Sequence, residues 1–162
     1  MLISPSKYQI ELAKKSDKKS ILRFYKTNHY SARFIGFDSC YLIKNNEEII
    51  ASVIISRCDE DRESIVNLAN KSQYFLHALV VAPAYRGVGL ASMLIQSVLP
   101  RYHPLVCFAQ DSLSTLYLKQ GFSELESTQI KQVLLPALFN RYCQYLSKES
   151  SLTVFSNEYD IP

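Results

Sequence analysis

The sequence predicts a mixed α/β fold in which a central, mostly antiparallel sheet is flanked by helices. Three observations lead to this fold class. Short apolar or alternating segments that are typical of strands recur along the chain. Segments with helical periodicity follow the first of these strands and several strands of the second half. The second half then repeats the order strand, helix, strand. Such an order is typical of one sheet covered by helices, and the length of 162 residues suits a single domain spanning residues 1–162.

The N-terminal third supplies the first strands and helix. Residues 8–12 alternate between apolar and polar side chains, which is typical of a strand. Ser16 or Asp17 can cap a helix that places Ile21, Phe24, Tyr25 and Asn28 on one face. Residues 31–37 are expected to form a second, short helix.

Two strands and an insertion come next. Segments 40–44 and 48–57 are apolar, and the Asn45-Asn46 pair between them is a turn signal, so they predict a hairpin. Residues 59–73 are polar, acid-rich at their start, and expected to be an irregular insertion.

The second half alternates strands and helices. Segment 74–81 is predicted to be a buried strand, and Leu90, Met93, Leu94 and Val98 then form a helical stripe. The remaining elements are expected as strand 104–109, helix 112–119, strand 122–126, a helix starting near Pro136 and a last strand at 152–155.

Composition excludes several function classes. Hydrophobic residues make up 48% of the chain and charged residues 20%, as in ordinary globular domains. The net charge of +3 is too small to argue for nucleic-acid binding. No apolar run approaches 18 residues and no signal-peptide pattern begins the chain, so we expect a cytoplasmic protein without membrane association. A homodimer is left open.

The four cysteines do not indicate a metal site. No Cys-x-x-Cys or His-x-x-x-His spacing occurs, so no metal is expected. Cys40, Cys107 and Cys143 lie in apolar runs and are predicted to be small buried side chains. Cys58 does not lie in an apolar run.

The most informative stretch is Tyr85-Arg86-Gly87-Val88-Gly89-Leu90-Ala91, at the start of the predicted second-half helix. Small residues let backbone N–H groups converge there, and the helix N-terminus adds a partial positive charge, an arrangement that suits a pyrophosphate. A dinucleotide fingerprint would need a third glycine, and a Walker loop would need Gly-Lys-Ser/Thr; both are missing. A helix-start turn built for packing alone is the structural alternative.

The order Arg86-x-x-Gly89-x-Ala91 resembles the acyl-CoA pyrophosphate loop of the GNAT N-acetyltransferase superfamily, whose pattern is Gln/Arg-x-x-Gly-x-Gly/Ala. A second segment, residues 111–122, is similar to that family's Asn-x-x-Ala-x-x-x-Tyr-x-x-x-Gly-Phe signature. Tyr117 and the Gly121-Phe122 pair match, and we assign Asp111 and Ser114 to the positions of the Asn and Ala. The resemblance is strong over residues 76–122, and covers the first 60 residues by element order only.

The resemblance implies a GNAT-like fold, splayed at the cofactor site, with acetyl-CoA as cosubstrate. Backbone groups of the strand segment 79–81 would pair with pantetheine, and N–H groups of residues 86–91 would take the pyrophosphate. The hydroxyl of Ser92 could assist. The residues implied for the cofactor are Leu79, Val80, Val81, Arg86, Gly87, Val88, Gly89, Leu90, Ala91, Ser92 and Ser114. The Arg86 guanidinium either contacts phosphate or remains in solvent at the turn while the backbone of Arg86 binds the ligand.

Two residues are candidates for proton transfer. The resemblance implies that Tyr117 protonates the leaving thiolate. Alternatively, Tyr117 is a core aromatic residue. The two roles are compatible, because a tyrosine can pack its ring in the core and keep its hydroxyl at the site. His77 stands where many family members carry Glu, and an imidazole with a reference pKa of about 6.5 could accept the amine proton. The alternative for His77 is a structural residue of the strand. Glu60, Asp61 and Glu63 are further candidates for the base, or for attracting a cationic acceptor.

The predicted activity is therefore transfer of an acetyl group from acetyl-CoA to a primary amine, directly within a ternary complex. A non-catalytic acyl-CoA-binding or regulatory module on the same fold is the alternative, because fold does not fix function. A dinucleotide-dependent enzyme is a third. The acceptor is not identified by the sequence, although residues 59–73 and 136–146 are expected to shape its side of the site.

Overall fold

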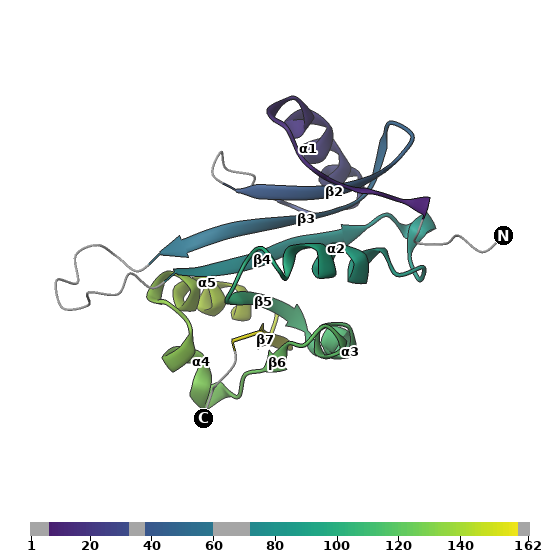
Figure 1. The fold of residues 1–162 in the computed structure, drawn as a ribbon. Helices are drawn as coiled ribbons and strands as arrows, with labels where there is room; N and C mark the ends of the chain where they lie inside the picture. The colour runs from purple at the N-terminus through teal and green to yellow at the C-terminus, as the bar shows by residue number, and fades with distance from the viewer. Residues whose placement is uncertain (1–6, 33–37, 60–71, 159–162) are drawn as a thin grey trace. The chain divides into compact units, whose positions relative to one another are not determined.

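Residues 7–32, 38–59 and 72–158 are described by the computed structural model, and they form five α-helices and a seven-stranded mixed sheet that is mostly antiparallel (Figure 1). This is the fold class that the sequence predicts. The chain divides into two units: residues 1–56 with 76–101, and residues 57–75 with 102–162. Each unit is described by itself below.

The strands of the first unit follow each other in the order β1-β2-β3-β4. They are β1 (Ile10–Leu12), β2 (Ser39–Asn45), β3 (Glu48–Asp59) and β4 (Ser72–Val81), of which β3 and β4 also run into the second unit. Strands β1 and β2 pair antiparallel, as do β2 and β3, with Tyr41 opposite Val53. The hairpin turns at Asn46, which has a φ of 57°, so the predicted Asn-Asn turn is confirmed.

Helix α1 (Lys18–Thr27) covers one face of these strands. On the predicted face, Ile21, Phe24 and Tyr25 are buried in one cluster with residues of β2, β3 and β4. Asn28, the fourth residue of that face, is the C-cap and is only partly buried. Asp17 precedes the helix without capping it through its side chain. Its carboxylate instead accepts the Lys14 N–H at 2.8 Å, and this bond, aided by nearby Lys44, lowers the pKa of Asp17 against a smaller effect of burial.

Helix α2 (Leu90–Val98) follows β4 through a short 3-10 turn at Pro83–Tyr85. Leu90, Leu94 and Val98 of the predicted stripe are buried, together with Ile95, whereas Met93 is only partly buried. Because these residues recur every three to four positions, the helix is anchored along its length and its first turn is held in place.

The second unit contains β5 (Leu105–Gln110), β7 (Leu152–Ser156) and β6 (Ser123–Glu124), in the order β5-β7-β6. Strand β7 pairs antiparallel with both neighbours. Helix α3 (Ser114–Lys119) starts after a 3-10 turn at Asp111–Leu113, two residues later than the sequence predicts. Helices α4 (Ser127–Val133) and α5 (Pro136–Leu146) complete the unit (Figure 1).

Helix α4 was not expected from the sequence. Its start is marked by Glu126, whose backbone N–H donates to the Gln129 side chain at 3.0 Å, a reciprocal capping arrangement. The break between α4 and α5 is held by buried Gln73, whose amide donates to the Val133 carbonyl and accepts from the Leu135 N–H. One side chain thus satisfies two backbone groups that the break would leave unpaired.

The prediction for the cysteines is only partly right. Cys40 and Cys107 are buried, as expected, but Cys143 is exposed. The buried face of α5 passes through Leu138 and Tyr142, so the next residue, Cys143, points away from that face. The predicted helix at 31–37 and most of the predicted insertion at 59–73 lie outside the described residues.

Candidate functional site

The glycine loop requires left-handed backbone at two positions. Gly87 has a φ of 81° and Gly89 a φ of 90°, values that residues with a Cβ rarely adopt. Gly89 is the N-cap of α2, and the first intrahelical bond runs from the Met93 N–H to its carbonyl at 3.0 Å. The N–H groups of residues 90–92 therefore lack a partner one turn earlier in the helix. This first turn has the geometry of an anion-binding site.

Arg86 is tied to the end of β4. Its Nε donates to the Val81 carbonyl at 2.9 Å, although the residue itself is exposed. This bond places Nε at the end of β4, while the side chain remains accessible to solvent. The family resemblance implies that this part of the β4 backbone pairs with pantetheine, and a carbonyl oxygen that already accepts one bond has a second lone pair.

His77 lies in β4 and is partly buried. Its Nε2 is 2.7 Å from the Ser56 Oγ on β3, within the same unit. Whichever atom donates the proton, this short bond fixes the orientation of the imidazole ring. A ring held in this way is suited to accept or pass on a proton at a defined place.

The residue after His77 has an unusual backbone. Ala78 has a φ of 54° in the middle of β4 and is almost completely buried. Left-handed backbone costs a residue with a Cβ about 1–2 kcal/mol. The Ala78 carbonyl accepts a 2.7 Å hydrogen bond from the hydroxyl of Tyr25 in α1, which offsets part of this cost. An unpaired buried carbonyl would cost about 1–3 kcal/mol more.

Tyr25 belongs to a buried polar chain in the first unit. Its side chain also hydrogen-bonds Ser52, whose Oγ is 3.2 Å from the Cys40 Sγ. Burial raises the pKa of Tyr25 far above its ordinary value; nearby Cys40 adds to this effect and the bond with Ser52 opposes it. Burial likewise raises the pKa of Cys40 to about 11. Both groups are therefore neutral at physiological pH and act as hydrogen-bonding groups rather than charges.

Tyr117 lies in α3, in the second unit. It is 4% exposed, stacks on Phe155 with ring centroids 5.2 Å apart, and meets the edge of Phe122 at 5.6 Å. Burial raises the pKa of Cys107, and a side-chain hydrogen bond with Tyr117 opposes that rise. The ring of Tyr117 is thus a core aromatic side chain, with its hydroxyl next to a thiol on β5.

The positions assigned to Asp111 and Ser114 need correction. Counted back from Tyr117, the Asn and Ala of the family signature fall on Gln110 and Leu113, so the assignment is one residue out of register. The Ser114 hydroxyl donates to the Asp111 carbonyl at 2.7 Å, a local bond across the start of α3. Ser114 therefore stabilises this helix start in the structure.

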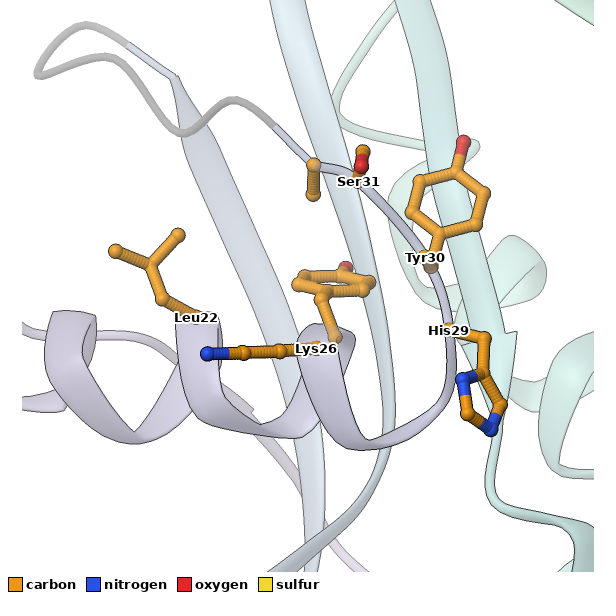
Figure 2. A pocket seen from close by; sticks show the side chains of 7 residues that line it. Leu22, Lys26, His29, Tyr30 and Ser31 are labelled. Carbon is orange, nitrogen blue, oxygen red and sulfur yellow. The ribbon is translucent and has the colours of Figure 1, made fainter.

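A pocket of about 530 Å³ opens at the end of α1, and sequence reasoning missed it. Figure 2 shows Leu22 and Lys26 on the helix, and His29, Tyr30 and Ser31 on the segment that leaves it. Tyr25 and Ala32 complete the lining. Tyr25 thus lines the pocket and also reaches the backbone of β4 next to His77. The cluster of Tyr25, His29 and Tyr30 was the signal in the sequence that could have indicated it.

The segments expected to shape the acceptor side are only partly described. Glu60, Asp61 and Glu63 lie outside the described residues, and Asp59 pairs with Arg57 at 2.8 Å. Helix α5 begins at Pro136, as predicted, and packs through Leu138 and Tyr142 in the core of the second unit.

Within the described residues, no three His, Cys, Asp or Glu side chains gather as a metal site would need. In that same part of the chain, no helix has the length and apolar character to cross a bilayer.

Comparison with known proteins identifies the family of the chain. The model of the acetyltransferase (GNAT) family matches residues 7–122. No curated protein sequence matches the chain.

Among solved structures, Escherichia coli ElaA is 16% identical, with a TM-score of 0.58, covering 93% of this chain and 98% of its own. Arabidopsis thaliana Naa50, in complex with the bisubstrate analogue CoA-Ac-MVNAL, is 17% identical, with a TM-score of 0.57 and coverage of 94% and 99%. Arabidopsis thaliana NAA60, also with a bisubstrate analogue, is 15% identical, with a TM-score of 0.56 and coverage of 74% and 86%.

At these identities the solved structures support the fold alone, whereas the family model covers more than half of the chain and includes the glycine loop and Tyr117. The chain belongs to the acetyltransferase (GNAT) family.

Proposed function

We propose that this protein is an N-acetyltransferase whose residues 1–162 act as one GNAT-like domain. It transfers the acetyl group of acetyl-CoA to a primary amine within a ternary complex. The observation that carries the proposal is the pair of left-handed glycines, Gly87 and Gly89, in front of the N-terminus of α2. Family membership supports the same cosubstrate, and a similar structure, that of NAA60, was solved with acetyl-CoA.

In the proposed reaction the neutral amine attacks the thioester carbonyl carbon, forming a C–N bond and a tetrahedral oxyanion. The C–S bond then breaks and CoA leaves as a thiolate. His77 takes the proton that the amine loses, and Tyr117 donates a proton to the thiolate. No covalent intermediate on the protein is needed, because both substrates are bound together. The products are the acetylated amine and free CoA thiol.

We place the acceptor at the pocket at the end of α1. Its described lining contains Lys26 and His29 but no Asp or Glu, together with the aromatic side chains of Tyr25 and Tyr30. Such a lining favours an amine attached to a neutral or anionic body over a polyamine, because a polycation would meet like charge. The peptide-bearing CoA analogue in the similar Naa50 structure makes short peptides with a free N-terminus a class to test.

Two measurements test the proposed function. The first is a thermal melt with and without acetyl-CoA. A ligand at about 100 times its Kd stabilises the native state by about 2.7 kcal/mol. A melting temperature that does not change at millimolar acetyl-CoA would refute the proposal. The second is release of CoA thiol with a panel of amines, amino acids, polyamines and N-terminal peptides. A protein that binds acetyl-CoA but releases no thiol above buffer rates with any acceptor is the non-catalytic module instead.

A further inference from the structure

The left-handed Ala78 is held from outside its own strand. Its carbonyl accepts the Tyr25 hydroxyl at 2.7 Å, and the two residues are 53 positions apart in the sequence. Tyr25 is 1% exposed and Ala78 3% exposed, so water does not compete for the bond. Alanine itself disfavours positive φ, so its residue type does not account for this conformation. The contact supplied by α1 holds the carbonyl of this residue in place.

The bond also fixes the next amide group along the strand. In a trans peptide the carbonyl oxygen of one residue and the N–H of the next point in opposite directions. Because the Ala78 carbonyl points at Tyr25, the Leu79 N–H must point away from it. Leu79 is the first of the β4 residues proposed to pair with pantetheine, and His77, the proposed base, precedes Ala78.

Tyr25 is itself fixed at both ends. Its ring packs edge-on against Phe24, and its side chain also bonds Ser52, which contacts Cys40. A hydroxyl that other groups hold in place transmits its position to the carbonyl it binds. The same ring lines the pocket at the end of α1, so one residue contacts both the proposed acceptor side and the strand proposed to bind the cofactor.

We propose that Tyr25 is a positioning residue for acyl transfer, whose hydroxyl keeps Ala78 left-handed and thereby aims the Leu79 N–H at the acetyl-CoA side of β4. This inference rests on the proposed function. Tyr25 does not touch the reacting atoms in this assignment; it acts through the backbone between His77 and Leu79.

The test uses Tyr25→Phe, which keeps the ring and removes the hydroxyl, with Tyr8→Phe as a matched control at another buried tyrosine of the same unit. Acetyl-CoA affinity is measured by calorimetry on the full chain. Tyr25→Phe should weaken binding about tenfold or more, since a buried carbonyl loses its donor, and Tyr8→Phe should not. Equal affinity in wild type and Tyr25→Phe overturns the inference.

A second variant separates positioning from loss of packing. Glycine adopts positive φ as readily as negative, so adding Ala78→Gly to Tyr25→Phe should recover most of the lost affinity. A double variant no better than Tyr25→Phe overturns the positioning role.

The amide resonance of Leu79 is followed by NMR in the ligand-free protein, where it should shift in Tyr25→Phe and return toward its original place in the double variant. An unmoved Leu79 resonance in Tyr25→Phe counts against the inference whatever acetyl-CoA does. A wild type that fails to bind acetyl-CoA refutes the proposed function alone.

Discussion

Replacing Gly89 by alanine tests the pyrophosphate loop most directly. The φ of Gly89 is 90°, and a residue with a Cβ pays about 1–2 kcal/mol for left-handed backbone. For a protein of this size 1 kcal/mol lowers the Tm by about 2–4 °C, so Gly89→Ala should melt about 2–8 °C lower. This loss concerns folding only, and it must be separated from any loss of ligand binding.

Gly121→Ala provides a matched control. Gly121 also has a φ of 90°, and a Cβ added there would meet no atom within 4 Å. Because the two φ values are equal, the backbone cost of Gly121→Ala should match that of Gly89→Ala. The position of Gly121 after α3 lies outside the loop proposed to bind pyrophosphate. Any difference between the two variants in acetyl-CoA binding is then due to the position of Gly89 in the loop, and not to backbone strain, which both variants share.

The assay is a thermal melt at a fixed acetyl-CoA concentration of about 100 times the wild-type Kd. Wild type and Gly121→Ala should gain about 2.7 kcal/mol, which corresponds to about 5–11 °C. If the added methyl group weakens binding a hundredfold, Gly89→Ala gains only about 0.4 kcal/mol, or about 1–2 °C. A Gly89→Ala protein that keeps the full ligand-induced shift would show that the pyrophosphate does not lie on this loop.

Three further predictions concern proton transfer and the thiols. Tyr117→Phe keeps the stack on Phe155 but removes the proposed acid, so turnover should fall by a factor on the order of 10² at unchanged acetyl-CoA affinity, measured by thiol release. If His77 accepts the amine proton, wild-type activity should fall as the pH drops and the imidazole becomes protonated, and His77→Gln should lose both this acidic limb and much of the rate. Iodoacetamide in the native protein should modify the exposed Cys143 readily but spare Cys40, whose pKa burial raises to about 11, and Cys107, whose pKa burial also raises.

Each of these predictions has its own control. Undiminished turnover in Tyr117→Phe would leave the thiolate to take its proton from water. For His77 the acceptor amine titrates as well, so variant and wild type are compared with one acceptor, and His103→Gln controls for the loss of a histidine. A pH profile of His77→Gln identical to that of wild type would return His77 to a structural role. For the cysteines, mass spectrometry before and after unfolding locates the label, and labelled Cys40 in the native protein would contradict its burial.

Much of the first unit could be predicted because its signals are local. The stripe of α1, the turn at Asn46 and the glycines before α2 each depend on spacing or on a single residue's backbone preference. The left-handed Ala78 could not be predicted. Alanine disfavours that conformation, and the hydroxyl that binds its carbonyl lies 53 residues away in the sequence. The pocket at the end of α1 could not be predicted either. It is lined by the end of α1 and by the segment that follows it. The periodicity of the sequence does not indicate the path of that segment.

The errors in the second unit have a similar origin. Cys143 lies in an apolar run, but in a helix the face on which a residue lies decides whether its side chain is buried. Cys143 does not lie on the buried face of α5. Helix α4 was missed because it spans seven residues, although its capping pair of Glu126 and Gln129 was visible in the sequence.

The bond between Arg86 and the Val81 carbonyl has a consequence for the kinetics of association. It uses Nε alone, which leaves the terminal nitrogens of the guanidinium to meet an incoming anion. A cation already in place beside the loop attracts a polyanionic ligand before contact, so it should raise the association rate more than it slows dissociation. Because mobile ions screen such attraction over about 10 Å at 0.1 M ionic strength, acetyl-CoA should arrive more slowly as salt rises. Replacing Arg86 by a neutral side chain should flatten that dependence on salt.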